Sequence, residues 1–546
     1  MFRAIISLYR KLRSRLGFQP SVEPLPVRSV SAAEEAERIL DLVDREGRIT
    51  YLPSFYWILV QAPDEYRVKI GAAVERVLRS IKPDRLPWIG DLCRARGYSL
   101  APIDWSRKRP EELIPAGVEA DVRLALYGFS SFHPVGYFRE KAVRLLAEER
   151  SGGELSYLLI RMNDWVEPVR KIARDAVAER LVPGYAVHFR GLLPLVQKIK
   201  RWAREDHSSI VSAIERLISS DKEILLGGLA APDGETRRVC YRLAAQSSVI
   251  SGRELLTALL RERESAVRSL ALKLIADKLS RDEVEACIEP LLRDPFAPVR
   301  TQALALYCTF FLSSAENLLK KCACDKALSV REISRFYLKQ LGVTDIIGLY
   351  CERLATTTAP DPGLLLGIGE AGSVENVPLL TGFLSHHASR VVKAAIRSIM
   401  SLAPDKATNL LQPFIADERP GVSKLAMICL SLRSFEVDEE KMAAIFRSSK
   451  VHHVRRNSLR LLCLISHWAS IFYIIEACAQ EDAALRQIGF NALEKWLKTG
   501  VHISTDPSPE QAFRAQQALE RHGEAFDGFT RRQLAFFLKG TIERQA

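Results

Sequence analysis

The chain has 546 residues, of which 47% are hydrophobic and 26% charged, and its 78 basic and 66 acidic residues give a net charge of +12. This composition is ordinary for a globular protein and allows a large apolar core. The mild positive charge permits an anionic partner without requiring one. A helix that spans a bilayer needs about 20 consecutive apolar residues. The sequence contains no uninterrupted apolar run of that length, so we expect no such helix.

The N-terminal segment is basic and contains no acidic residue in its first 20 positions. Its basic residues alternate with apolar ones that can share a helix face, so residues 1–19 predict a basic amphipathic helix. Two interpretations remain open: residues 1–18 make a peripheral contact with an anionic membrane, or they cap the helices that follow. Residues 20–31 carry three prolines and predict an extended linker. Residues 32–136 predict an irregular helical N-terminal extension.

From residue 137 to residue 500 a two-helix motif returns every 30 to 32 residues over most of its length. The motif is aligned on the residue that precedes a recurrent arginine, and a small residue usually follows this anchor four positions later. Earlier copies are anchored on Phe138 and Val169, and the later anchors are Thr236, Val267, Val299, Val330, Asp361, Val391, Val422, Val454 and Leu485. One helix pair cannot bury its apolar face alone, so this period predicts stacked pairs, an all-α superhelix. Residues 501–546 are predicted to close the stack with two capping helices.

The turn between the two helices carries an aspartate and, six residues later, an arginine. This spacing occurs in the pairs Asp164 and Arg170, Asp294 and Arg300, and Asp325 and Arg331. The motif resembles the HEAT-repeat family, in its short bacterial form seen also in phycobilisome-lyase-like repeats. The resemblance implies that these residues form a polar ladder between copies, and that the protein binds a partner rather than catalyses a reaction.

Three copies depart from the ladder pattern. The copy near 361 lacks the arginine, His386 replaces the aspartate in the copy near 391, and Ser449 replaces it in the copy near 454. We therefore expect the ladder to be interrupted in these copies. Such a break marks either a binding site or sequence drift.

The sequence contains no motif that predicts a reaction. Phosphate-binding loops, nucleophile elbows and paired-histidine zinc helices are missing from it, so we expect no catalytic residue, cofactor or metal. The ten cysteines form no Cys-x-x-Cys pair, which favours buried thiols in a reducing, cytoplasmic compartment. A likeness to HEAT-like DNA glycosylases would give Asp164, beside Trp165, a catalytic role with Trp202 nearby, but the ladder already explains Asp164.

Two basic stretches without acidic residues, 180–204 and 441–475, are the candidate binding segments. The candidate contact residues are Arg447, Lys450, His452, His453 and Arg456 in one stretch, and Lys198, Arg201 and Trp202 in the other. The favoured function is a non-enzymatic scaffold that binds a protein along the concave face formed by the second helices. The alternative is nucleic-acid binding through the same stretches. A chaperone for a bound pigment is a third possibility, by analogy of fold.

Overall fold

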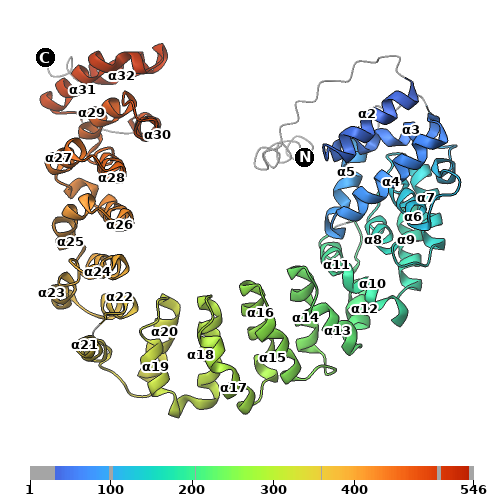
Figure 1. Ribbon diagram of the computed structural model, residues 1–546, viewed down its shortest axis with the longest axis horizontal. Coiled ribbons are helices and arrows are strands. Elements are labelled where there is room, and N and C mark those ends of the chain that lie inside the picture. The colour runs from blue at the N-terminus through green and yellow to red at the C-terminus, as the bar shows by residue number, and fades with distance from the viewer. Residues whose placement is uncertain (1–30, 97–102, 203, 358, 501–505, 540–546) are drawn as a thin grey trace. The chain divides into compact units, whose positions relative to one another are not determined.

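Every regular element in the described part of the chain is a helix (Figure 1). The computed structural model describes residues 31–96, 103–202, 204–357, 359–500 and 506–539. The predicted amphipathic helix 1–19, its membrane contact through residues 1–18 and nearly all of the linker 20–31 lie outside these residues. The predicted all-α stack of helix pairs is confirmed. Within the same residues, no helix is long and apolar enough to cross a bilayer.

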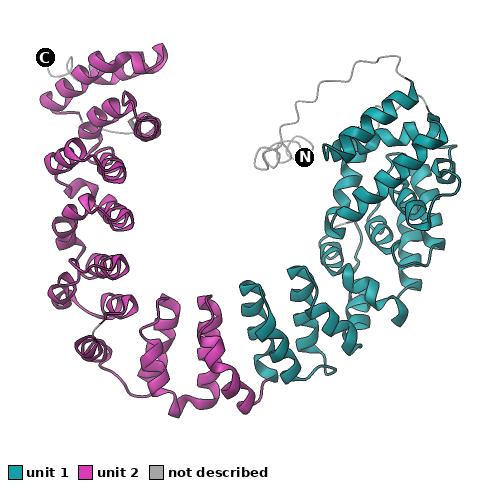
Figure 2. Cartoon of the chain, viewed as in Figure 1, with its two compact units in different colours: residues 1–278 teal, residues 279–546 magenta. Residues whose placement is uncertain are grey.

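The chain divides into two compact units, residues 1–278 and 279–546 (Figure 2). The helices of unit 1 are α2 (Ala32–Asp44), α3 (Phe55–Gln61), α4 (Asp64–Ser80), α5 (Pro87–Arg96), α6 (Ala120–Ser130), α7 (Gly136–Glu148), α8 (Leu155–Arg161), α9 (Glu167–Glu179), α10 (Ala186–Gly191), α11 (Leu193–Ile199), α12 (Ser208–Ser219), α13 (Lys222–Leu229), α14 (Gly234–Gln246), α15 (Gly252–Arg261) and α16 (Ser265–Ile275). Short 3-10 turns are η1 (Ile49–Ser54), η2 (Pro83–Arg85), η4 (Pro110–Leu113), η5 (Pro183–Tyr185) and η6 (Ala276–Lys278).

Unit 2 is a more regular stack. Its helices are α17 (Arg281–Leu292), α18 (Ala297–Phe311), α19 (Glu316–Cys322), α20 (Leu328–Gln340), α21 (Ile346–Thr356), α22 (Pro362–Ala371), α23 (Val377–Thr381), α24 (Ser389–Leu402), α25 (Pro404–Leu411), α26 (Pro420–Ser431), α27 (Glu439–Ser448), α28 (His452–Leu462), α29 (His467–Cys478), α30 (Ala483–Gly500), α31 (Pro509–His522) and α32 (Gly528–Lys539). Its 3-10 turns are η7 (Leu312–Ser314), η8 (Val374–Asn376), η9 (Gln412–Ala416), η10 (Ser434–Glu436) and η11 (Gly523–Ala525).

The helices of unit 2 alternate between two rows. We call α17, α19, α21, α23, α25, α27 and α29 the first row, and α18, α20, α22, α24, α26, α28 and α30 the second row. From α22 to α28 the second row lies on one side of the stack and the first row on the other (Figure 1). Helices α22, α24, α26 and α28 each contact the next one in the second row. Within the described part of unit 2, the first-row helices lie along one side of α22 to α28 and no helix covers the opposite side (Figure 1).

Local sequence signals explain where the helices of a pair begin. Helix α17 starts with a capping box, in which Ser280 and Glu283 each accept the other's backbone N–H. In the second helix of that pair, Pro298 lies within the first turn of α18, where a missing N–H costs nothing. The turn between the helices is fixed by Asp294, whose side chain accepts the N–H of Phe296 at 2.8 Å. The stretch from Asp294 to Arg300 thus forms the turn and the start of the second helix.

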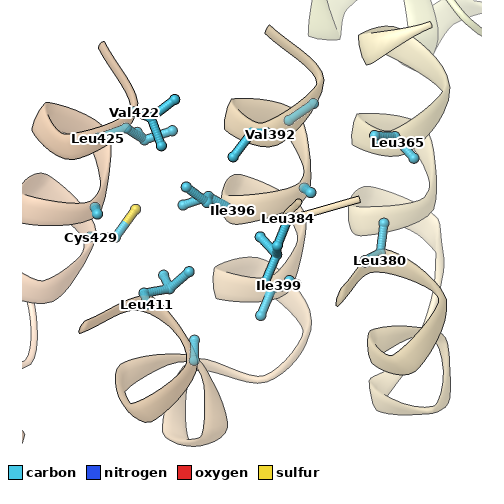
Figure 3. Close-up of a cluster of buried hydrophobic side chains, with 14 of the residues drawn as sticks. Leu365, Leu380, Leu384, Val392, Ile396, Ile399, Leu411, Val422, Leu425 and Cys429 are labelled. Carbon is cyan, nitrogen blue, oxygen red and sulfur yellow. The ribbon is translucent and has the colours of Figure 1, made fainter. Parts of the chain in front are cut away.

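The small residues four positions after each anchor lie in the core. Ala271, Ala303, Ala395 and Ala426 are all fully buried, because neighbouring second helices approach at these points. Figure 3 shows the core between three successive pairs, where Leu365 of α22, Ile396 of α24 and Leu425 of α26 point inward. The backbones also approach closely at Gly489 of α30, where a Cβ would lie 2.6 Å from the backbone nitrogen of Cys478. Only glycine fits there without a shift of the backbone.

The copy near residue 361 does not keep the constant spacing. Asp361 accepts the N–H of Gly363 at 2.9 Å, as Asp325 accepts the N–H of Ala327 at 2.7 Å. Asp361 is therefore the turn residue of its pair and not the anchor position that the spacing predicts. The reason is the longer connection between α20 and α22, which shifts the register of this single copy.

Candidate functional site

The recurrent arginine ties its own turn together. Arg300 donates a hydrogen bond to the backbone oxygen of Asp294 at 2.7 Å, and Arg331 donates one to that of Asp325 at 2.6 Å. Arg170 donates to the backbone oxygen of Asp164 in the same way, at 2.9 Å. The spacing of six residues is what lets the guanidinium reach the carbonyl at the start of the turn.

A second set of bonds joins consecutive copies. Arg300 donates to both carboxylate oxygens of Asp325, at 2.9 and 2.6 Å. Arg139 likewise donates to both carboxylate oxygens of Asp164, at 3.0 and 2.8 Å. Bidentate pairs of this kind are strong and directional. Arg331 instead pairs with Glu370 of α22, which also receives a hydrogen bond from Arg335 at 2.7 Å. In each of these pairs the arginine therefore bonds to a carboxylate further along the chain. For Arg331, before the irregular copy, this carboxylate is Glu370 instead of a turn aspartate.

Two of the departing copies keep the turn with a residue other than aspartate. His386 accepts the N–H of Ala388 on Nδ1 at 3.0 Å, and Ser449 accepts that of Val451 on Oγ at 3.1 Å. Arg419 bends back to the backbone oxygen of His386 at 2.9 Å. An imidazole nitrogen or a hydroxyl can cap a backbone N–H, but neither offers the arginine a carboxylate.

Asp164 is a structural carboxylate. Its side chain is fully buried and accepts hydrogen bonds from Arg139 and, at 2.8 Å, from Arg161. Burial by itself would raise its pKa, but the hydrogen bond from Arg139 and the charges of both arginines bring the pKa below the usual range. Trp165 is 66% exposed and stacks under Arg204 at 4.0 Å, while Trp202 is half-buried. A carboxylate enclosed by two guanidinium groups cannot reach a base, as a glycosylase would need.

Three of the six basic residues in the stretch 180–204 form internal ion pairs. Arg180 is buried and pairs with Glu154 at 2.7 Å. Lys198 pairs with Asp84 at 3.1 Å, and Lys200 with Glu215 at 2.9 Å. Among the described residues Arg201 forms no ion pair and is exposed. These cations therefore hold unit 1 together more than they offer a binding surface.

The candidate residues of the stretch 441–475 differ in their contacts and exposure. His453 lies 3.0 Å from the backbone oxygen of Asp417, and His452 lies 3.7 Å from Asp482. Arg447 and Lys450 are exposed at the end of α27 and in the following turn. Arg456 of α28 donates a hydrogen bond from Nε to the backbone oxygen of His452 at 3.3 Å and is half-buried. The described residues include no group of three or more acidic, histidine or cysteine side chains that could hold a metal.

The free face of the second row carries Arg456 and Arg460 of the basic stretch 441–475 together with cations that lie outside both basic stretches. Helices α24, α26 and α28 contain no acidic residue. On α24 and on α28 the exposed or half-buried cations are three or four residues apart, so they lie on one side of each helix. We call this set the cationic face: Arg390, Lys393 and Arg397 of α24, Lys424 of α26, and Arg456 and Arg460 of α28. Within the described part of the chain no carboxylate lies within ion-pair distance of these six side chains.

Aliphatic side chains border the cationic face. Ile428, in the middle of α26, is 45% exposed. Leu432 and Leu464 follow the C-terminal ends of α26 and α28, at equivalent positions, and are 74% and 45% exposed. We call these three residues the apolar edge. Charged and aliphatic groups together on one uncovered face are typical of a protein interface.

Two cavities of about 510 and 500 Å³ open in unit 1. The larger lies among α4, α6, α8 and α10, and the other lies between α13 and α15. None of the candidate contact residues lines either cavity. The predicted binding residues are thus surface groups and not the walls of a pocket.

No family model matches the chain, and no curated protein matches it. Among solved structures, importin beta is 13% identical, with a TM-score of 0.35, over 93% of this chain and 72% of that chain. Kap95p with RanGDP is 12% identical, with a TM-score of 0.35, over 94% of this chain and 67% of that one. Kap121p bound to Pho4p is 12% identical, with a TM-score of 0.34, over 83% and 57%. At these values the likenesses carry no argument about what this chain binds.

Proposed function

We propose that the chain is a non-enzymatic scaffold that binds a protein on the second-row face of unit 2. The observation that carries the proposal is the cationic face of α24, α26 and α28 together with its apolar edge. Cations without a carboxylate within ion-pair distance attract an anionic partner. Exposed aliphatic groups such as Leu432 gain free energy when a partner covers them, about 25 cal/mol per Å² of apolar surface.

The apolar edge favours protein over nucleic acid as the partner. Single-stranded nucleic acid is held by aromatic side chains on which bases stack, whereas Ile428, Leu432 and Leu464 are aliphatic. Lys198 and Lys200, in the other basic stretch, are engaged with Asp84 and Glu215. The experiments must therefore distinguish binding of a protein from binding of a nucleic acid.

The remaining parts of the proposal concern origin and compartment. The short repeat is of the kind expected in bacterial HEAT proteins, and a pigment-chaperone role rests on that resemblance alone. All ten cysteines are unpaired, and most are buried, which supports a reducing, cytoplasmic compartment.

Site-specific photo-crosslinking tests the proposal. A benzophenone amino acid at Leu432, on the second row, is compared with one at Leu410, which is 37% exposed on α25 of the first row. Illumination in an extract of the native cells should give a protein adduct from position 432 that is absent from position 410. Equal adducts from both positions, or an adduct that nuclease removes, would contradict the proposal.

A further inference from the structure

Three cations occupy one equivalent position on consecutive second-row helices. Lys393, Lys424 and Arg456 each follow an anchor, Val391, Val422 or Val454, by two residues. Because α24, α26 and α28 contact one another in order, the three side chains form a column across the helices. Lys393 leans toward the next helix: its Nζ lies 3.6 Å from where a Cβ on Gly421, at the start of α26, would stand.

The spacing of this column is set by helix packing. Neighbouring helix axes lie about 8–10 Å apart. A polyproline II segment has three residues per turn and a rise of about 3.1 Å per residue, so every third side chain returns to the same face after about 9 Å. In a β-strand, by contrast, side chains three residues apart point to opposite faces. Of these two extended conformations, only polyproline II presents every third side chain to one successive helix after another.

We infer that the cationic face receives an extended acidic segment of a partner protein in polyproline II conformation, with carboxylates at positions i, i+3 and i+6. This inference rests on the proposed function and specifies the chemistry of its ligand. The three carboxylates meet Lys393, Lys424 and Arg456 in turn. Arg397 and Arg460 flank the column on α24 and α28, and between them Ile428 offers the middle of the segment an apolar contact.

The register of the segment distinguishes this inference from general charge attraction. A surface that attracts acids only by net potential binds any peptide of equal charge equally well. Three pairs at exposed sites, each weak alone, add only when all three are in register. We therefore expect about a tenfold preference for the matched spacing.

Fluorescence anisotropy with two synthetic peptides tests the inference on the full chain. One peptide is three Glu-Pro-Ser repeats, and the other has the same composition with glutamates at i, i+2 and i+4. The first should bind about tenfold more tightly. Lys424→Glu should abolish this preference, and Lys406→Glu, an exposed lysine on α25 of the first row, should leave it unchanged.

The outcomes separate the inference from the proposed function. Equal affinities for the two peptides would overturn the inference. Failure of both peptides to bind would overturn it too, while an adduct specific to position 432 would leave the scaffold proposal standing. If oligo-dT bound the chain and Lys424→Glu weakened that binding, with no binding of either peptide, both proposals would fall.

Discussion

Arg300 of α18 is bonded at the same time to the turn that precedes its own helix and to Asp325 in the turn of the next pair. Its guanidinium donates to the carboxylate of Asp325 at 2.9 and 2.6 Å and to the backbone oxygen of Asp294 at 2.7 Å. Only 4% of the side chain is exposed. One residue thus fixes both the shape of a repeat and its distance from the next.

We expect Arg300→Ala to destabilise unit 2 by about 3–5 kcal/mol, because it leaves Asp325 without its cation in a partly buried site. Arg300→Lys should cost less, since it keeps the charge but loses the bidentate geometry. Urea denaturation followed by circular dichroism measures both changes. The control is Arg293→Ala, whose ion pair with Glu289 is largely exposed. A loss for Arg300→Ala no greater than for this control would show that the ladder does not stabilise the stack.

Asp164 should make unit 1 sensitive to acid. Its pKa in the folded chain is lowered by its two arginine partners, although burial opposes this. A group with a lowered folded pKa contributes stability above its unfolded pKa, about 3.9, and loses it as the pH falls through the folded value. We expect Asp164→Asn to destabilise the protein at neutral pH and to flatten the decline of unfolding free energy below about pH 4. An unchanged decline would show that Asp164 is not among the groups responsible.

His133 should contribute a second pH dependence, at higher pH. Burial, followed by the charge of Arg139, lowers its pKa from 6.5 to about 3. The unfolded chain binds a proton near pH 6.5 and the folded chain does not, so stability falls as the pH drops below 6.5. The expected slope is about 1.4 kcal/mol per pH unit.

The variant His133→Gln should remove this slope between pH 6 and pH 4, whatever its effect at neutral pH. Urea midpoints across that range give the measurement. Parallel curves for the variant and the original chain would argue against a buried neutral imidazole.

Glu370 should control how firmly α20 is joined to α22. It is the shared acceptor of Arg331 and Arg335 of α20. In the first row, the Tyr350 hydroxyl of α21 donates to the backbone oxygen of Ala323 at 3.0 Å. We expect Glu370→Gln to cost about 1.5–3 kcal/mol locally and to accelerate hydrogen exchange in α20 and α22. Helices α26 and α28 should exchange as before. Acceleration spread evenly over unit 2 would contradict a local role.

The stack could be predicted from the sequence because its determinants are local. A buried Ala303 or Ala395 and a turn that begins with Asp294 follow from periods within one or two helices. The register of the copy near residue 361 was predicted wrongly, because a longer connection before Asp361 breaks the period. The acceptor of Arg331 could not be predicted either, since the changed register of this copy is what places Glu370 beside Arg331.

The candidate site was harder to predict, because charge along the sequence is not charge on a surface. Lys198 looked free in a run of basic residues, yet it pairs with Asp84, 114 residues away. In the cationic face only Arg456 and Arg460 belong to such a run. Lys393, Lys424 and Arg456 are about 31 residues apart, and they become neighbours only when the helices stack. A search for cations at one repeat position, without acids on the same helix, would have found them.

A charge exchange between Lys424 and the centre of the three-repeat peptide tests whether the cationic face binds its ligand in register. The central glutamate of the peptide is replaced by lysine, and both peptides are titrated against the original chain and Lys424→Glu. We predict that the lysine peptide binds Lys424→Glu more tightly than it binds the original chain, while the glutamate peptide shows the reverse preference. Weakening of both peptides by Lys424→Glu, with no restoration by the exchanged charge, would contradict the placement of the segment on this face.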